Sequence, residues 1–157
     1  MIRLDPMTED EFRVFQDRDI TSYASENVKA GYWTEQEALE KARQQYAKLL
    51  PNGVQTEGHH LFTIVETAAE TKIGVLWLQV RKEGARSSGF IYSIELDENQ
   101  RGKGYGRQAM LALEQKARDL GLKAIGLHVF AHNTTAHHLY EKMGYQTKSM
   151  NMIKELE

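Results

Sequence analysis

The sequence predicts an α/β (α+β) fold, in which a mixed central β-sheet carries helices on both faces. Two apolar runs, at 61–66 and 72–80, are separated only by the short join at 68–71, which is typical of an antiparallel hairpin. Further along, runs at 89–96 and 123–130 flank a helical pattern, as in a parallel strand–helix–strand crossover. A sheet that contains both kinds of pairing is mixed.

Length and composition favour one domain over residues 1–157. A hydrophobic content of 41% in 157 residues is enough for one core, and the sequence contains no repeat or low-complexity linker. We expect a helical segment at 1–60 and a sheet-bearing core at 61–157.

The first helix is expected to begin at a capping box and to extend as far as Val28. Thr8 provides the cap, and Glu11 stands three residues later in the box position. The apolar residues on one side of this helix are Phe12, Phe15 and Ile20.

A second capping box predicts the second helix, after a break at Gly31-Tyr32-Trp33. Thr34 is the cap and Glu37 the box residue, and Pro51-Asn52-Gly53 ends the helix. Its expected apolar contacts are Leu39, Tyr46 and Leu49.

The remaining elements follow from local patterns. Residues 81–88 are expected to form a polar turn before the strand at 89–96. A helix follows, with Met110, Leu113, Ala117 and Leu120 at helical spacing, and Gly121 ends it. We then expect a buried strand at 123–130, a helix at 134–143 and at least one final strand at 145–156.

The join between the strand at 89–96 and the next helix combines glycine with positive charge. It reads Arg101, Gly102, Lys103, Gly104, Tyr105, Gly106, Arg107. Glycine allows backbone N–H groups to approach an anion closely, and the first helical turn adds unpaired donors at the positive end of the helix dipole. These features predict a phosphate-binding turn.

Two motifs identify the phosphate ligand. The turn is neither a dinucleotide fingerprint, because Arg107 stands where a third glycine is needed, nor a Walker A loop. It matches [QR]-x-x-G-x-[GA], and residues 133–145 match N-x-x-A-x-x-x-Y-x-x-x-G-[FY]. Together, over about residues 71–155, they resemble the GNAT superfamily of N-acyltransferases, which hold acetyl-CoA.

The resemblance implies where acetyl-CoA, the co-substrate, binds. Its pyrophosphate would lie on the backbone of residues 101–107, and its pantetheine arm would pair with the backbone of Ile94, Glu95 and Leu96 like an added strand. The thioester would lie between the strands at 89–96 and 123–130, which are splayed in this family. Asn133 would hydrogen-bond the arm, although it is also placed to cap the helix at 134.

Transfer of the acetyl group to an amine requires two proton movements. A primary amine, with a pKa near 10, must lose a proton, and the departing thiolate must gain one. Because the chain has no cysteine, direct attack in a ternary complex is the simplest mechanism. The resemblance makes Tyr140 the general acid; without the motif, a tyrosine on an apolar helix face would be a core residue.

The sequence leaves the general base open. Some relatives place a glutamate or tyrosine early in the strand before the glycine turn, but this chain has Phe90 there. His128 and Glu95 are the candidates, with Glu66 behind them and a water chain as the alternative. Strand parity does not separate them, because a bulge commonly interrupts this strand in the family.

The acceptor is expected to contact the N-terminal half. In the family, the loop that contains Gly31, Tyr32 and Trp33 overhangs the acceptor site, and further wall candidates are Tyr23, Trp77 and Tyr92. Core packing is the alternative role of these aromatics. The sequence does not distinguish a small-molecule amine from a peptide or protein amine.

Composition limits which partners and which compartment we expect. A net charge of −2 gives no basic field for nucleic acid, and no apolar run is long enough to span a membrane. Without a secretory signal pattern we expect a cytoplasmic protein. The histidines show no metal-ligand spacing, so we expect no metal. Relatives commonly form homodimers, which the sequence neither predicts nor excludes.

Two other functions fit the motifs less well than an acetyltransferase. A non-catalytic acyl-CoA-binding sensor or partner module is suggested by the missing base at Phe90. A nucleotide-binding protein would use the glycine turn for ATP, but no Walker lysine or Mg²⁺-binding carboxylate motif follows.

Overall fold

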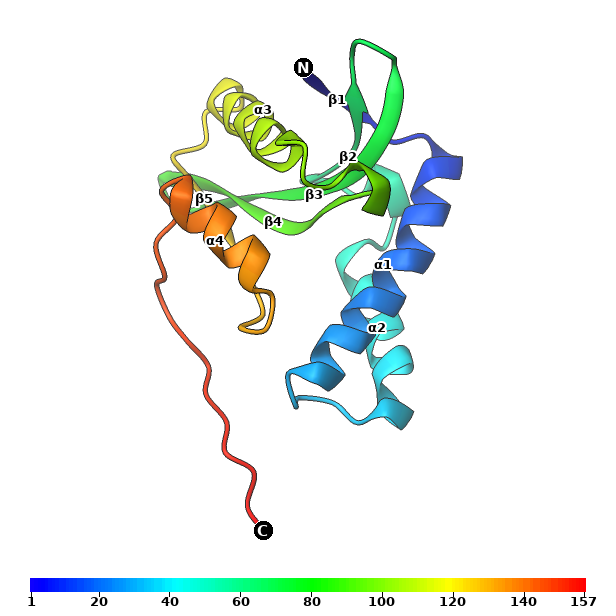
Figure 1. The fold of residues 1–157 in the computed structure, drawn as a ribbon, viewed down its shortest axis with the longest axis vertical. Coiled ribbons are helices and arrows are strands. Elements are labelled where there is room, and N and C mark those ends of the chain that lie inside the picture. Colours follow the sequence, from blue (N-terminus) through cyan, green and yellow to red (C-terminus); the bar gives the residue numbers. More distant parts are fainter.

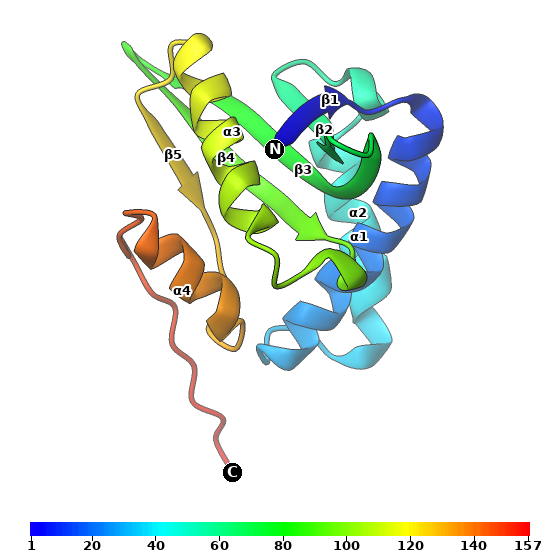
Figure 2. The same ribbon diagram turned by 45° about the horizontal axis from the view of Figure 1, so that its top comes forward.

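The computed structural model describes residues 1–157 as a five-stranded sheet between helical layers (Figures 1 and 2). The sheet order is β1-β2-β3-β4-β5; only β4 and β5 are parallel, which confirms the mixed sheet. The strands are β1 (Ile2–Pro6), β2 (His59–Glu66), β3 (Thr71–Glu83), β4 (Arg86–Leu96) and β5 (Ala124–Leu127). The helices are α1 (Glu9–Lys29), α2 (Glu35–Leu49), α3 (Tyr105–Asp119) and α4 (Thr134–Lys142), with 3₁₀ turns at Gly53–Gln55 and Glu98–Gln100.

Both predicted N-terminal helices begin at their predicted caps. The Thr8 hydroxyl accepts a bond from the Glu11 N–H, and the Glu11 carboxylate accepts one from the Thr8 N–H. The Glu37 carboxylate accepts a bond from the N–H of Thr34 in the same way. Leu39 is the exception among the expected contacts, since it lies on the exposed side of α2.

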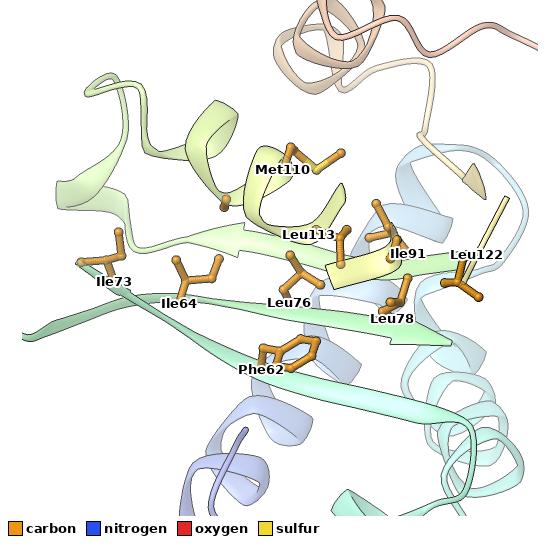
Figure 3. Packing of buried hydrophobic residues seen from close by; sticks show 11 residues of the cluster. Phe62, Ile64, Ile73, Leu76, Leu78, Ile91, Met110, Leu113 and Leu122 are labelled. Atoms are coloured by element: carbon orange, nitrogen blue, oxygen red, sulfur yellow. The ribbon is translucent and has the colours of Figure 1, made fainter. Parts of the chain in front are cut away.

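Alternation along the strands builds two separate cores. On one face, α1 and α2 pack on Leu61 and Trp77 through a cluster that includes Phe12, Phe15 and Tyr46. On the other face, α3 packs on the strands, and Figure 3 shows Met110 and Leu113 above Leu76 and its neighbours. Helices therefore cover both faces, as predicted.

β1, β3 and β4 differ from their predicted extents. β1 was not predicted: its five residues pair with β2, and only three of them are partly shielded from solvent, so its pattern is weak. Residues 81–88 are mostly not a turn. They extend β3 and β4 as paired strands, with Arg81 opposite Ser88 and Lys82 opposite Ser87. An exposed two-stranded ribbon needs no apolar residues, so its polar sequence shows no strand pattern.

The C-terminal predictions were partly wrong. The strand at 123–130 is reduced to β5, which contains no fully buried residue, whereas the sequence predicted a buried strand. The final strand at 145–156 does not form: the segment is extended but pairs with no other strand. A strand requires a hydrogen-bonding neighbour, which a local pattern does not supply.

Candidate functional site

The parallel pair β4–β5 opens at its C-terminal end. β5 pairs only with Ser88–Ile91 of β4, so residues 92–96 have β3 on one side and no strand on the other. The ladder of β3 and β4 shifts register beside Trp77, and Tyr92 is the extra residue of this bulge. The splayed strands expected from the family resemblance are therefore present.

The glycine turn begins where β4 ends. Gly102 and Gly104 adopt φ of 77° and 82°, a left-handed conformation that glycine enters at little cost. None of the N–H groups of residues 102–107 donates a hydrogen bond within the protein. Six adjacent free donors at the start of α3 are the kind of backbone groups that can bind an anion.

The turn, the end of β4 and α4 meet at Gly106. A Cβ on this glycine would lie 3.4 Å from Leu139 of α4 and 3.9 Å from Leu96 of β4. Tyr140, the next residue of α4, packs against the core beneath α3. Burial raises its pKa above the usual value near 10, so the hydroxyl keeps its proton at neutral pH.

Asn133 and His128 flank the loop between β5 and α4. Asn133 caps α4, where its side-chain oxygen accepts a bond from the Ala136 N–H at 3.3 Å. His128 is exposed just beyond the end of β5, with its ring edge-on to Phe130. From the same loop, His132 contacts Glu26 of α1, which ties this loop to the N-terminal helices.

Glu95 lies on the α1 side of the sheet, beside a buried carboxyl that the sequence analysis missed. Its carboxylate pairs with Arg101 at 3.4 Å and remains partly exposed. The neighbouring carboxyl belongs to Asp19, which accepts hydrogen bonds from the hydroxyls of Tyr46 and Ser93. Burial raises the pKa of Asp19 to about 6, and the negative charge of Glu95 adds to the rise.

Glu66, the further candidate base, and Phe90, which replaces a base found in some relatives, have structural roles. Glu66 lies in the turn between β2 and β3 and accepts bonds from the N–H groups of Ala68 and Ala69. Phe90 lies under the guanidinium of Arg81, whose Cζ is 4.1 Å from the ring centroid.

A cavity of about 340 Å³ opens between α1, α2 and the sheet. Four of its lining residues are aromatic: Tyr23, Tyr46, Trp77 and Tyr92. The Trp77 and Tyr92 rings stack at 4.5 Å, and Tyr92 directly follows the last β4 residue that pairs with β5. Trp33 packs edge-on against Tyr23, and thus reaches the cavity wall from the predicted loop, whereas Tyr32 projects into solvent.

The structure contains no group of three acidic or histidine side chains placed to hold a metal ion. None of its helices combines the length and the hydropathy needed to span a membrane.

Comparison with known proteins identifies the family. The model of the acetyltransferase (GNAT) family matches residues 21–145. The chain belongs to the GNAT family of acetyltransferases. It is 41% identical to the uncharacterized N-acetyltransferase YdgE of Bacillus subtilis, over 98% of this chain and 97% of that protein.

A second Bacillus subtilis relative links this GNAT chain to an experimental structure. The chain is 41% identical to the putative acetyltransferase YycN, whose crystal structure superposes with a TM-score of 0.95 over 99% of both chains. A putative acetyl transferase from Pyrococcus furiosus shares the fold, with a TM-score of 0.69 at 21% identity. The mycothiol acetyltransferase of Propionibacterium freudenreichii is 33% identical over 57% of this chain, a match that covers 28% of that protein.

Asp19 is expected to make the stability of this GNAT domain depend on pH. Its pKa of about 6 in the folded state exceeds the unfolded value of 3.8, so the native state binds more protons between these values. We expect Asp19 to contribute stability at pH 4 that is lost as the pH rises through 6. A difference of two pKa units corresponds to about 3 kcal/mol at most.

The measurement is urea unfolding of the unaltered protein and Asp19→Asn between pH 4 and 8. The stability of the unaltered protein relative to the variant is expected to decrease with rising pH across this range, then level off. A constant difference would show that Asp19 does not titrate in the folded state.

Proposed function

We propose that this protein transfers an acetyl group from acetyl-CoA to a primary amine by direct attack in a ternary complex. One observation carries the proposal: six free N–H groups, the open edge of β4 and the tyrosine-bearing helix α4 converge around Gly106. Membership of the family supports acetyl transfer as the reaction, and this convergence supports the choice of residues.

The chain offers a matched surface for each part of acetyl-CoA. The N–H groups of residues 102–107 would receive the pyrophosphate, with Arg101, Lys103 and Arg107 adding charge. Backbone groups of Ile94, Glu95 and Leu96 lie on the unpaired edge of β4, where an amide-bearing arm can add like a strand. When bound, acetyl-CoA supplies the activated acyl group.

Tyr140 is proposed to protonate the departing sulfur. Its hydroxyl retains its proton at neutral pH, and the helix α4 that bears it packs against the glycine turn through the preceding residue, Leu139. For the amine, Glu95 is proposed as the acceptor of a proton, because its carboxylate lies beside Asp19 on the α1 side of the sheet and stays in contact with solvent. His128, exposed beyond β5, is the alternative.

The aromatic cavity is proposed to hold the acceptor next to the open strands. Tyrosine and tryptophan faces bind flat or apolar groups, and Lys48 and Gln45 leave a polar rim at the entrance. The similarity to mycothiol acetyltransferases favours a small-molecule acceptor over a protein, and a cavity of about 340 Å³ is of a suitable size.

Shortening one wall of this cavity is expected to weaken acceptor binding selectively. We expect Tyr23→Ala to raise the KM for the acceptor about tenfold, as one aromatic contact of about 1.5 kcal/mol is lost, with the affinity for acetyl-CoA unchanged. Tyr32→Ala, in the exposed loop, is the matched control. A larger effect of Tyr32→Ala would place the acceptor at the loop instead.

The function is tested by incubating the protein with acetyl-CoA and a panel of amines and measuring release of the CoA thiol. Mass spectrometry should detect an N-acetylated amine, and the intact mass of the protein should stay unchanged with acetyl-CoA alone. An acetylated protein intermediate would exclude direct attack. Loss of turnover in Glu95→Gln, but not in His128→Gln, would assign the base.

A non-catalytic acyl-CoA-binding module is the second candidate. The observation in its favour is Phe90, which occupies the position of a family base and packs under Arg81. Such a module would bind acetyl-CoA but release no thiol with any amine tested.

A further inference from the structure

The side of β4 that faces α1 and α2 is acidic toward the end of the strand. Ser93 donates a hydrogen bond to the carboxyl of Asp19 at 2.9 Å, and the carboxylate of Glu95 lies beside it. Tyr92, which precedes these residues, stacks on Trp77 in the wall of the aromatic cavity. The aromatic wall therefore ends at two carboxyl groups.

At the other end of this wall lies a guanidinium that is held in place. Arg81 reaches from β3 across β4, where its Cζ is 4.1 Å from the ring centroid of Phe90. One terminal nitrogen donates to the Tyr92 hydroxyl at 3.1 Å, and Nε donates to the side-chain oxygen of Gln79 at 3.0 Å. Two of the five guanidinium N–H groups are used in this way, so three remain for a ligand.

The partners of Arg81 are all uncharged. Gln79, Tyr92 and the ring of Phe90 fix its orientation, but Arg81 forms no salt bridge in the structure. A guanidinium held in one orientation presents a planar fork that matches the two oxygens of a carboxylate or a phosphate. Arg81 is thus a positioned cation that lacks an anion.

A neutral hydrogen-bond donor lies beside this cation. The Trp77 indole N–H donates to Nδ1 of His59 at 2.9 Å, and an indole nitrogen can only donate. The proton of a neutral His59 is therefore on Nε2, which bonds to no other group in the chain. Burial lowers the pKa of His59, and the nearby charge of Arg81 adds to the effect, so the ring is neutral at neutral pH.

The cavity itself adds one positive charge and no negative charge. Lys48 is the single charged side chain among its lining residues, and it is exposed and forms no salt bridge. A ligand of this cavity therefore meets positive charge at Lys48 and Arg81, aromatic rings between the ends of the wall, and carboxyls at Asp19 and Glu95.

We propose that the acceptor is a primary amine that also carries an anionic group, which Arg81 binds while the amine points toward Glu95. The inference rests on the proposed function. An amine arrives as an ammonium ion, which the carboxyls attract and the guanidinium repels, so the charges orient the acceptor. Phe90 and Ser93 are three residues apart, which separates the amine from the anion by roughly 10 Å or less at about 3.3 Å per residue.

The first test measures binding without turnover. The protein, alone and with saturating CoA, is titrated with ε-aminocaproate and its shorter and longer homologues, with the matching aminoalkyl phosphonates, and with hexylamine. The tryptophan fluorescence of Trp77 and Trp33, both at the cavity wall, reports binding. We expect one of the anionic series to bind at least about tenfold more tightly than hexylamine, and the better series identifies the anion.

The second test removes the guanidinium. We expect Arg81→Gln to raise the KM for the preferred anionic amine about ten- to a hundredfold, the usual loss for a charge-assisted pair, with the KM for hexylamine within about twofold. Arg86→Gln is the matched control, because Arg86 is an exposed arginine of the same two-stranded ribbon and forms no salt bridge. Thermal unfolding checks that both variants keep the fold.

Two results would overturn the proposal. One is equal affinity of the unaltered protein for hexylamine and for every anionic amine. The other is an Arg81→Gln variant that loses both kinds of acceptor alike, because Arg81 would then only support the ring of Tyr92. Tight binding of an anionic amine without release of the CoA thiol would instead contradict the proposed function and leave the anion site standing.

Discussion

Replacing Tyr140 with Phe is expected to lower turnover about 10²–10³-fold, the usual contribution of a positioned general acid. The substitution removes one hydroxyl and keeps the ring that packs against the core beneath α3. Because the hydroxyl is not proposed to contribute to acetyl-CoA binding, the affinity for acetyl-CoA should remain within about twofold of that of the unaltered protein. Steady-state kinetics and calorimetry measure the two quantities separately.

Tyr145 provides the matched control, since its ring lies 5.9 Å from that of Tyr140. The Tyr145 hydroxyl is buried without a hydrogen-bond partner, so Tyr145→Phe should preserve turnover and leave stability unchanged or higher. Full activity in Tyr140→Phe would remove the general acid from the mechanism. Equal losses in both variants would indicate a packing effect.

Substituting Ala at both Gly102 and Gly104 is expected to weaken acetyl-CoA binding about ten- to a hundredfold. Each L-residue in a left-handed conformation costs about 1–2 kcal/mol, which favours another path for the turn. The free N–H groups would then no longer converge on one anion, and each charge-assisted bond lost is worth about 1.5–3 kcal/mol. A titration with acetyl-CoA measures the loss.

The variant Gly121→Ala separates the effect of backbone strain on stability from an effect on acetyl-CoA binding. Gly121 has a φ of 77°, and a Cβ there would meet no atom within 4 Å, as is also true of Gly102 and Gly104. It lies after the opposite end of α3, so it should incur a similar loss of stability per site and leave binding unchanged. Unimpaired binding in the Gly102/Gly104 variant would show that the turn does not hold the phosphates.

Much of the fold was predictable from short-range signals. Capping boxes at Thr8 and Thr34 predicted where α1 and α2 begin, and apolar runs predicted most of β2, β3 and β4. The errors occur where the outcome depends on distant partners. β1 exists because β2 pairs with it, and residues 145–156 form no strand because nothing in the chain pairs with them.

The candidate site was predictable in part for the same reason. The glycine turn and the helix of Tyr140 have local motifs, and the structure brings them together at Gly106. Asp19 was missed although a signal was present: it follows Phe12 and Phe15 at helical spacing, which places a carboxyl on the buried side of α1. Its partners Tyr46 and Ser93 come from distant segments, so only the structure reveals them.

Calorimetric titration of the protein with acetyl-CoA, with ATP and NADH as comparisons, tests the central claim most directly. We expect saturable binding of acetyl-CoA at one site per chain and no comparable binding of ATP or NADH. A folded protein that does not bind acetyl-CoA, or that binds ATP equally well, would contradict the account and leave only the family fold.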